Sequence, residues 1–444
     1  MFSLSRDVVL SLVALLLKIV AGGLGYLMVL FASRVLGPEE YGQFTVLFSI
    51  AMLLSLFSNF GQSNFFIKQF SIEQHSPAMG MQSLYRFVNV TSILGACSGV
   101  LLWLLYLYIS NNLSVINLVS GGGFISIYSM SLTAMGAMRS FGMPNYAIFL
   151  RDIVWRITVI LSLFVVSLLG VGLSASSVLL VVFIGMLLPF FLQVISLFSK
   201  GVFVAGKVQG LSGVNWMSTS VGLTAIGVVS AADGYVFNIA TSYFLGDFEA
   251  GAVFASVKTV EVVSIFMMAV TLVMAKDFSM CLAKKDTLGL QRKLNVAIFL
   301  QILPVIFCFV FIVVFSQDIL IAFDPQYVRY WPFLIVMAIA MLVNSITGST
   351  VSLMQLGGLH WHHLFLQSTA IFLGLISMFY FVPAYGIDGV AYAYLLNKII
   401  WNFSALYVIR RNLGVDPSIF SLVFNVNRVN SYLFYDITKV SGNR

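Results

Sequence analysis

Long apolar runs separated by short polar breaks are the main pattern of this chain. The runs recur from about residue 10 to residue 410, and most are longer than the roughly 20 residues that a helix needs to cross a bilayer. They predict twelve membrane-spanning helices, over residues 10–33, 42–67, 84–109, 114–138, 147–169, 174–198, 215–244, 249–275, 294–316, 331–356, 361–382 and 387–410.

The breaks between these runs carry turn-forming residues. Examples are Gly37-Pro38, Asn111-Asn112, Gly170-Val171-Gly172 and Tyr385-Gly386. The longest expected loops run over about 68–83 and 276–293. After Arg411, the segment 419–437 mixes apolar residues with asparagines, which favours an interfacial helix and leaves disorder as the alternative.

The composition agrees with a chain that lies mostly in lipid. Of 444 residues, 60% are hydrophobic and 9% are charged, whereas soluble domains carry about 25% charged residues. The three cysteines are far apart and imply no disulfide framework. We therefore expect an all-α integral membrane protein.

The positive charges predict the orientation. If the N-terminus is cytoplasmic, seventeen Lys and Arg residues fall on the cytoplasmic side, only Arg34 and Arg329 fall on the other, and four lie within spans. This asymmetry follows the positive-inside rule and predicts an even number of spans with both termini cytoplasmic. It also accounts for the net charge of +7 without a nucleic-acid partner.

A weak internal repeat predicts two similar halves. The pattern LG-x-x-E-x-G occurs twice, and two further matches follow at similar offsets: residues 36–42 with 245–251, 138–142 with 354–358, and Gly172 with Gly386. Six helices per half would give both halves the same orientation, with a two-fold axis along the membrane normal. The predicted parts are an N-terminal bundle over 1–198, a cytoplasmic linker over 199–214, a C-terminal bundle over 215–412 and a cytoplasmic tail over 413–444.

Two motifs resemble a known family. The segment 34–44 (RVLGPEEYGQF) and the segment 383–391 (PAYGIDGVA) are similar to the O-antigen flippases of Wzx type. These form part of the polysaccharide transporter family, within the multidrug/oligosaccharidyl-lipid/polysaccharide exporter (MOP) superfamily. Gly61 and Lys68 also fit this resemblance.

The resemblance implies a flippase for polyprenyl-diphosphate-linked oligosaccharides in a bacterial inner membrane. It implies two six-helix bundles that open alternately to each side, no cofactor, and a polymerase and chain-length proteins as pathway partners. Proton or sodium coupling through Asp233 or Glu261 stays open. The alternatives are a drug or ion transporter of the same superfamily and a polytopic polysaccharide polymerase.

Six charged residues inside spans are the candidate substrate-cavity residues. A charge at a helix centre costs roughly 2.5–3.5 kcal/mol when it faces lipid, so we expect these side chains to face the interior or to form pairs. They are Lys18, Arg156, Asp233, Lys258, Glu261 and Lys398.

Each of these residues also has a structural explanation. Lys258 and Glu261 are spaced i, i+3 and would pair on one helix, and Arg156 would extend towards the cytoplasmic surface. Asp233 would form a structural pair. The sharper hypothesis is that Lys18, Asp233 and Lys398 line one central polar cavity, whose basic excess suits an anionic diphosphate.

The remaining candidates are weaker. Arg34, Glu39 and Glu40 are candidate residues of a periplasmic gate, with helix termination as the alternative. The cluster His360-x-His362-His363 is interpreted as solvated at an interface, so no metal site is predicted. No Walker A or zinc-protease motif is present, and no catalytic residue is predicted.

Overall fold

The computed structural model describes residues 6–75, 80–170, 172–202 and 216–424. These residues are almost entirely helical, and no β-strand occurs among them. Ten helical segments within this part are long and apolar enough to cross a membrane. The chain is a multi-pass membrane protein, and the predicted all-α fold class is confirmed.

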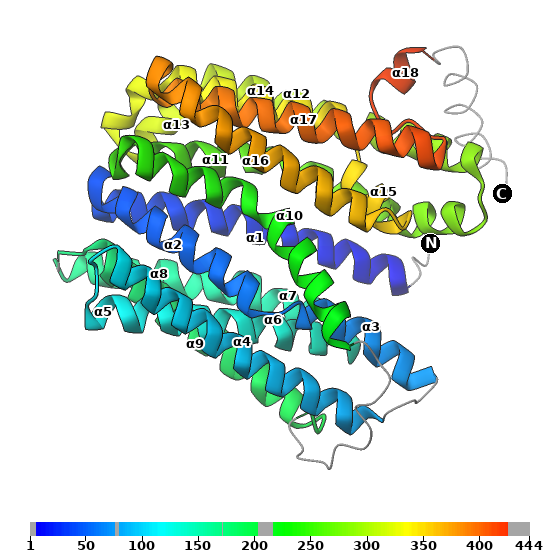
Figure 1. Ribbon diagram of the computed structural model, residues 1–444, viewed down its shortest axis with the longest axis horizontal. Coiled ribbons are helices and arrows are strands. Elements are labelled where there is room, and N and C mark those ends of the chain that lie inside the picture. The colour runs from blue at the N-terminus through cyan, green and yellow to red at the C-terminus, as the bar shows by residue number, and fades with distance from the viewer. Residues whose placement is uncertain (1–5, 76–79, 171, 203–215, 425–444) are drawn as a thin grey trace. The chain divides into compact units, whose positions relative to one another are not determined.

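The chain divides into two compact units, each described here by itself. The first contains Met1–Ser256 and Leu320–Arg329. Its described elements (Figure 1) are α1 (Arg6–Leu36), α2 (Pro38–Ser58), α3 (Gln62–His75), α4 (Met81–Ile109), α5 (Val115–Asn117), the π-helical turn η1 (Leu118–Gly122), α6 (Gly123–Ser140), α7 (Pro144–Ile148), the π-helical turn η2 (Phe149–Val154), α8 (Trp155–Leu168), α9 (Ala175–Phe198) and α10 (Trp216–Leu245).

The second unit contains Val257–Ile319 and Tyr330–Arg444. Its described elements are most of α11 (Asp247–Ala283), α12 (Thr287–Val314), part of α13 (Ser316–Phe323), α14 (Trp331–Ile346), α15 (Thr350–Leu356), α16 (His360–Tyr385), α17 (Ile387–Leu413) and α18 (Phe420–Phe424). The 3-10 turn η3 (Pro325–Tyr330) connects α13 to α14. The first unit includes α10 and the first residues of α11, so the contacts divide the chain within α11, after Ser256, whereas the sequence pattern divides it before α10. The predicted bundle boundaries stay a prediction.

Two of the twelve predicted spans are helical but fall outside the ten apolar segments. They correspond to α7–η2–α8, which contains Arg151, Asp152 and Arg156, and to α17, which contains Asn397 and Lys398. Their polar residues lower the mean hydropathy. These two helical segments therefore carry charged and polar side chains among apolar neighbours.

The predicted loop over 276–293 is wrong. Helix α11 continues to Ala283 and α12 begins at Thr287, so only a tight turn separates them. Asp286 caps α12 through its Oδ1 atom, which accepts a hydrogen bond of 2.8 Å from the Gly289 amide. The polar residues here are good helix formers, so both helices extend beyond their apolar stretches.

The predicted second span, 42–67, is interrupted in its C-terminal third. Phe60 (φ 47°) and Gly61 (φ 64°) adopt left-handed conformations between α2 and α3. Side chains form hydrogen bonds at this break, where backbone groups lack helical partners and lipid offers none. The Ser220 hydroxyl of α10 donates to the Phe60 carbonyl, and the Asn59 amide donates to the Ser129 carbonyl at 3.0 Å.

The last glycines of the two repeated motifs pack together. A Cβ atom on Gly251 would lie 3.2 Å from the Gly42 Cα atom, and one on Gly42 would lie 1.8 Å from the Asp247 carbonyl oxygen. Only glycine permits this approach between the first turns of α2 and α11.

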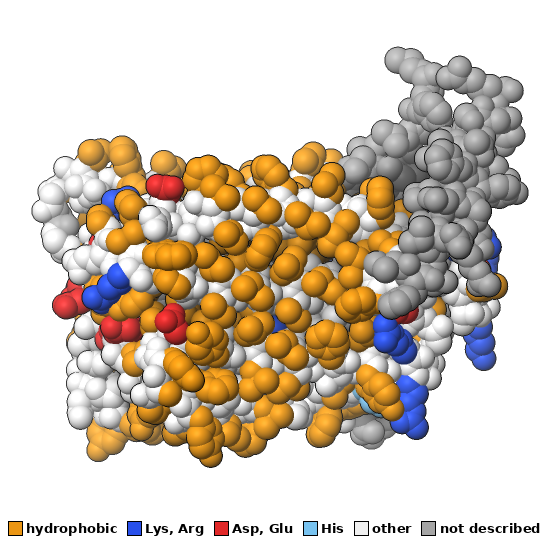
Figure 2. Space-filling model, turned by 90° about the horizontal axis from the view of Figure 1, so that it is seen from above, with side chains coloured by type: hydrophobic (Ala, Val, Ile, Leu, Met, Phe, Trp, Pro, Cys, Tyr) orange, Lys and Arg blue, Asp and Glu red, His pale blue; other side chains and the backbone are white. Residues whose placement is uncertain are grey.

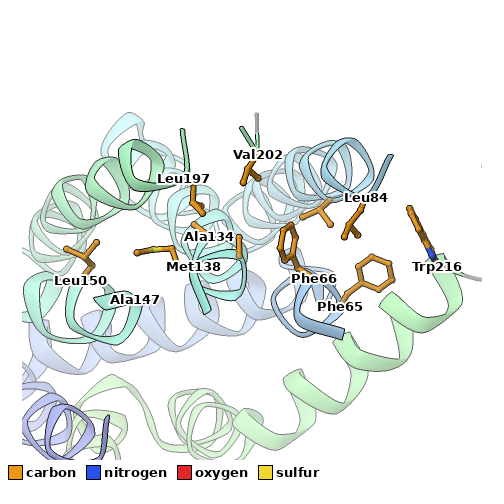
Figure 3. Packing of buried hydrophobic residues seen from close by; sticks show 12 residues of the cluster. Phe65, Phe66, Leu84, Ala134, Met138, Ala147, Leu150, Leu197, Val202 and Trp216 are labelled. Atoms are coloured by element: carbon orange, nitrogen blue, oxygen red, sulfur yellow. The ribbon is translucent and has the colours of Figure 1, made fainter. Parts of the chain in front are cut away.

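Apolar side chains are found both on the exposed faces of the helices and in the packed contacts between them. On the face drawn in Figure 2, hydrophobic side chains cover the middle of the helices, and most charged side chains gather near the helix ends. Inside the first unit, Phe65, Phe66 and Trp216 belong to a buried cluster with Leu84 (Figure 3).

Candidate functional site

Three basic side chains meet around one carboxylate in the first unit. Lys18 Nζ of α1 lies 2.5 Å from Asp152 Oδ2, and Arg151 Nη1 lies 2.9 Å from Asp152 Oδ1. Arg156 Nη1 donates to the main-chain oxygen of Asp152. We call these four residues the Asp152 cluster.

The local backbone explains how this cluster forms. Arg151 and Asp152 lie in the π-helical turn η2, and both side chains are buried. Turns of this kind in α-helices are frequent at functional sites. Helix α1 makes room for the cluster at Gly25, because a Cβ atom there would lie 2.9 Å from Arg156 Nε.

Aromatic side chains complete the surroundings of the arginines. Arg151 Nη2 donates to the Tyr128 hydroxyl at 2.5 Å, and the Arg151 guanidinium carbon lies 4.7 Å from the Tyr128 ring centroid. The Arg156 guanidinium carbon lies 5.6 Å from the Trp155 ring centroid. Contacts between cations and ring faces stabilise the cations in a desolvated setting.

The charges of the cluster do not cancel. It holds three cations and one carboxylate, and within the described residues no second carboxylate forms an ion pair with any of the three cations. The side chain of Lys18 is 30% exposed and that of Asp152 is 7% exposed. The cluster therefore carries an excess of two positive charges. Lys18 and Arg156 are its partly exposed members, whereas Arg151 and Asp152 are buried.

The structure brings together two of the six predicted cavity residues, Lys18 and Arg156. Arg156 does not extend to a helix end as the structural alternative supposed, because it bonds to the backbone one turn earlier and packs against α1. Asp233 lies half-buried on α10, three turns from the helix end.

The other predicted cavity residues lie in the second unit. Lys258 Nζ and Glu261 Oε2 are 2.8 Å apart on α11, so the i, i+3 pair forms. Lys398 on α17 is buried, with its Nζ atom 5.0 Å from the Tyr394 ring centroid. The single cavity proposed for Lys18, Asp233 and Lys398 stays a prediction.

The predicted gate residues contact helix ends. Arg34 Nε and Nη2 donate to the carbonyl oxygens of Ala322 and Ile321, at 2.5 and 2.7 Å. Glu40 Oε2 accepts from the amide of Ala175, the first residue of α9, at 2.7 Å. Glu39 is exposed in the first turn of α2. These contacts agree with a role in ending and capping helices.

The prediction of a solvated histidine cluster is wrong for one of its members. His360 and His362 are exposed, but His363 is fully buried, with its ring centroid 5.0 Å from the Trp401 ring. The adjacent position on α16 turns towards the interior of the second unit, which the spacing of three histidines did not reveal. In the described part of the chain, no group of three potential metal ligands was found.

Sequence reasoning did not assign a role to Asp152, Arg151 or Tyr128. Arg151 was counted among the cytoplasmic charges, because it lies close to the predicted start of a span. The i, i+4 spacing of Asp152 and Arg156 within an apolar segment indicated that these two residues lie on one helix face and interact. Nothing in the sequence showed that Lys18, 134 residues earlier, would reach the same carboxylate.

Comparison with known proteins gives structural relatives only. No family model matches the chain, and no curated protein matches it in sequence. A multidrug resistance MATE family transporter of the MOP superfamily, in an inward-facing conformation, superposes with a TM-score of 0.69 at 13% identity, covering 91% of this chain and 98% of that chain.

Two further structures have similar scores. A MOP superfamily transporter from Pyrococcus furiosus, described as having a binding pocket of reverse polarity that suggests a different function, gives a TM-score of 0.66 at 13% identity, covering 91% of this chain and 95% of that one. The lipid II flippase MurJ, in an inward closed conformation, gives 0.64 at 16% identity, covering 94% and 91%. This chain has the fold of MOP-superfamily transporters, and the three relatives are transporters or flippases, not enzymes.

Proposed function

We propose that the protein is a flippase for polyprenyl-diphosphate-linked oligosaccharide repeat units, such as those of O-antigen or a similar surface polysaccharide. It would move them from the cytoplasmic to the periplasmic leaflet of a bacterial inner membrane by alternating access. The fold supports a transporter, and the charge of the Asp152 cluster supports the substrate class.

The observation that carries the proposal is the excess of positive charge around Asp152. A diphosphate at this site would neutralise the two uncompensated cations, whereas a cationic drug would be repelled. Arginine is well suited to phosphate because its planar guanidinium offers several donors in a fixed geometry. Arg151 is held by two partners, because its Nη1 atom donates to Asp152 and its Nη2 atom donates to Tyr128.

The pair between Lys18 and Asp152 suggests how the anion is received. While no substrate is bound, the Asp152 carboxylate neutralises part of the positive charge of the cluster. Lys18 is the more exposed partner, so it would move from Asp152 to the substrate diphosphate, while Arg151 would stay bound to Asp152. Asp152 would regain Lys18 when the substrate leaves, which prevents the diphosphate from being held too tightly.

Moving the substrate across the membrane makes and breaks no covalent bond. Each sugar hydroxyl that enters hydrocarbon without a partner costs about 4–8 kcal/mol, so a polar pathway in the protein is needed. The prenyl chain would stay in lipid, and the substrate would leave unchanged. If the cytoplasm is negative, outward movement of an anion is favoured by about 2.3 kcal/mol per charge per 100 mV.

A second candidate is a secondary transporter of drugs or ions. The structural likeness to multidrug transporters favours it, because the fold alone does not distinguish drug export from lipid flipping. Asp233 and Glu261 would then bind a cation or a proton. The basic excess at Asp152 favours the lipid-linked anion, and coupling of the flippase to protons or sodium remains compatible with both candidates.

The proposal is tested in cells that lack their own repeat-unit exporter. Surface polysaccharide is measured in cells that produce the wild-type chain, Lys18→Ala, Asp233→Asn or Lys398→Gln, and is normalised to the amount of protein in the membrane. We expect the wild-type chain to restore polysaccharide and Lys18→Ala to fail. Export of cationic dyes by the wild-type chain, with no polysaccharide, would favour the drug transporter instead.

Binding to the purified protein provides a second test. A short prenyl diphosphate should bind to the wild-type chain more tightly than the matching prenyl alcohol. Since a hydrogen bond to a charged group contributes about 1.5–3 kcal/mol, Lys18→Ala should weaken diphosphate binding by about tenfold or more. Equal binding of the diphosphate and the alcohol would reject recognition of the phosphate groups.

A further inference from the structure

A cavity of about 310 Å³ lies inside the first unit, away from the residues of the Asp152 cluster. Residues of α3, α4, α6 and α9 line it, together with Val202. Figure 3 shows four of the lining residues, Phe66, Ala134, Leu197 and Val202, on neighbouring segments. The volume is at the small end of the range of about 300–1,000 Å³ typical of ligand sites.

The lining is mostly apolar, and its few polar side chains form hydrogen bonds within the protein. Its polar members are Asn89, Ser92 and Thr133. The Asn89 amide donates to the Val202 carbonyl at 3.1 Å, and the hydroxyls of Ser92 and Thr133 are hydrogen bonded to each other at 3.1 Å. Water in a cavity needs two to four polar partners, so an apolar occupant fits this lining better than water.

The cavity is flanked by surfaces that face lipid. Ile93 lines it and is 52% exposed on α4, next to Leu94, which is 59% exposed. On α9, Val194 lines the cavity and the adjacent Ile195 is 66% exposed. Exposed apolar side chains on the spans of a membrane protein contact the hydrocarbon chains of lipids. A lipid chain is therefore always available next to this cavity.

Basic residues lie one helical turn beyond the lining. Lys200 is exposed and follows Leu197 by three residues, and its amide donates to the Leu197 carbonyl at 3.0 Å. Arg86 is exposed on α4 and precedes Asn89 by three residues. The hydrogen bond between Asn89 and Val202 joins the N-terminal part of α4 to the chain just after α9, so the backbone positions of Arg86 and Lys200 lie towards the same end of the lining.

We infer that this cavity binds one acyl chain of an anionic phospholipid, whose phosphate lies at Lys200 and Arg86. The apolar lining accounts for the chain, and the basic residues at one end account for the preference for an anionic headgroup. This site is separate from the proposed transport site and does not depend on the transported substrate.

The test is native mass spectrometry of the purified full chain, after delipidation and titration with phosphatidylglycerol or phosphatidylcholine. Two variants fill the cavity: Ala134→Leu in its wall and Val194→Trp at its half-buried side. Leu188→Phe is the matched control, because it enlarges a residue of α9 that faces lipid outside the cavity. Thermal unfolding shows whether each variant is folded.

We expect one phosphatidylglycerol to remain bound to the wild-type chain and to Leu188→Phe, and to be lost from a folded cavity-filling variant. Lys200→Gln should reduce phosphatidylglycerol binding by about fivefold, the effect of one basic residue near an anionic membrane surface. Equal retention by the folded cavity-filling variant and Leu188→Phe would overturn the site. Displacement of phosphatidylglycerol by an equal amount of a prenyl phosphate would overturn the assignment to phospholipid.

Discussion

Lys18 and Asp152, separated by 134 residues in the sequence, form an ion pair of 2.5 Å between α1 and the π-helical turn η2. The two partners are not equivalent. Asp152 is buried and also pairs with Arg151, whereas Lys18 is partly exposed and pairs with Asp152 alone among the described residues. Removal of either partner should therefore have different consequences.

The first prediction concerns stability. Asp152→Ala would leave Arg151 buried without its carboxylate, and removal of one partner of a buried pair costs about 3–5 kcal/mol. Lys18→Ala should cost much less, because Asp152 would keep Arg151. We therefore expect Asp152→Ala to lower the yield and the unfolding temperature of the purified protein strongly, and Lys18→Ala to leave both close to wild type.

The double variant Lys18→Ala/Asp152→Ala is the control for this comparison. It should be as unstable as Asp152→Ala alone, because Arg151 loses its carboxylate in both. Equal instability of the two single variants would contradict the asymmetry described here.

The second prediction concerns the close contact of the repeated glycines. Gly42→Ala should prevent stable folding, because its Cβ atom would lie 1.8 Å from a backbone oxygen that cannot move independently. The matched control is Gly23→Ala on α1, where the added Cβ atom has no neighbour within 4 Å. Size-exclusion chromatography should show a folded peak for Gly23→Ala only, and a normal Gly42→Ala peak would refute the tight crossing.

The apolar pattern was sufficient to predict the helices but not the polar contacts between them. Each predicted span corresponds to helical segments, since span length depends only on local composition. The break at Phe60-Gly61 was missed because Gly61 alone within an apolar run does not reveal a left-handed turn. The sequence singled out Lys18 as a charge inside a span, and its avoidance of lipid stays a prediction. Its partner depended on the packing of α1 against η2, which local sequence does not encode.

The third prediction concerns the membrane topology. After replacement of Cys97, Cys281 and Cys308, single cysteines are placed in the turns around residues 36–40, 111–113, 246–248, 324–328 and 384–387. A membrane-impermeant maleimide should label all of them from the periplasm, and should label Lys285→Cys only after the membrane is opened. Two or more of the five sites labelled only from the cytoplasm would reject a twelve-span topology with both termini inside.

The last prediction separates a capping role from a gating role at Arg34. Arg34 and Ser33 together donate to three successive carbonyls at the end of α13, those of Ile321, Ala322 and Phe323. A hydrogen bond contributes about 0.5–1.5 kcal/mol, and Arg34→Lys would lose the fixed two-point geometry of the guanidinium. We expect Arg34→Lys to lower the unfolding temperature and the amount of protein in the membrane, and to reduce surface polysaccharide only in proportion to that amount. Glu39→Gln, an exposed change in the same motif, should leave both measurements unchanged. A normal amount of Arg34→Lys protein with little polysaccharide would show instead that Arg34 acts in transport, as the gate hypothesis requires.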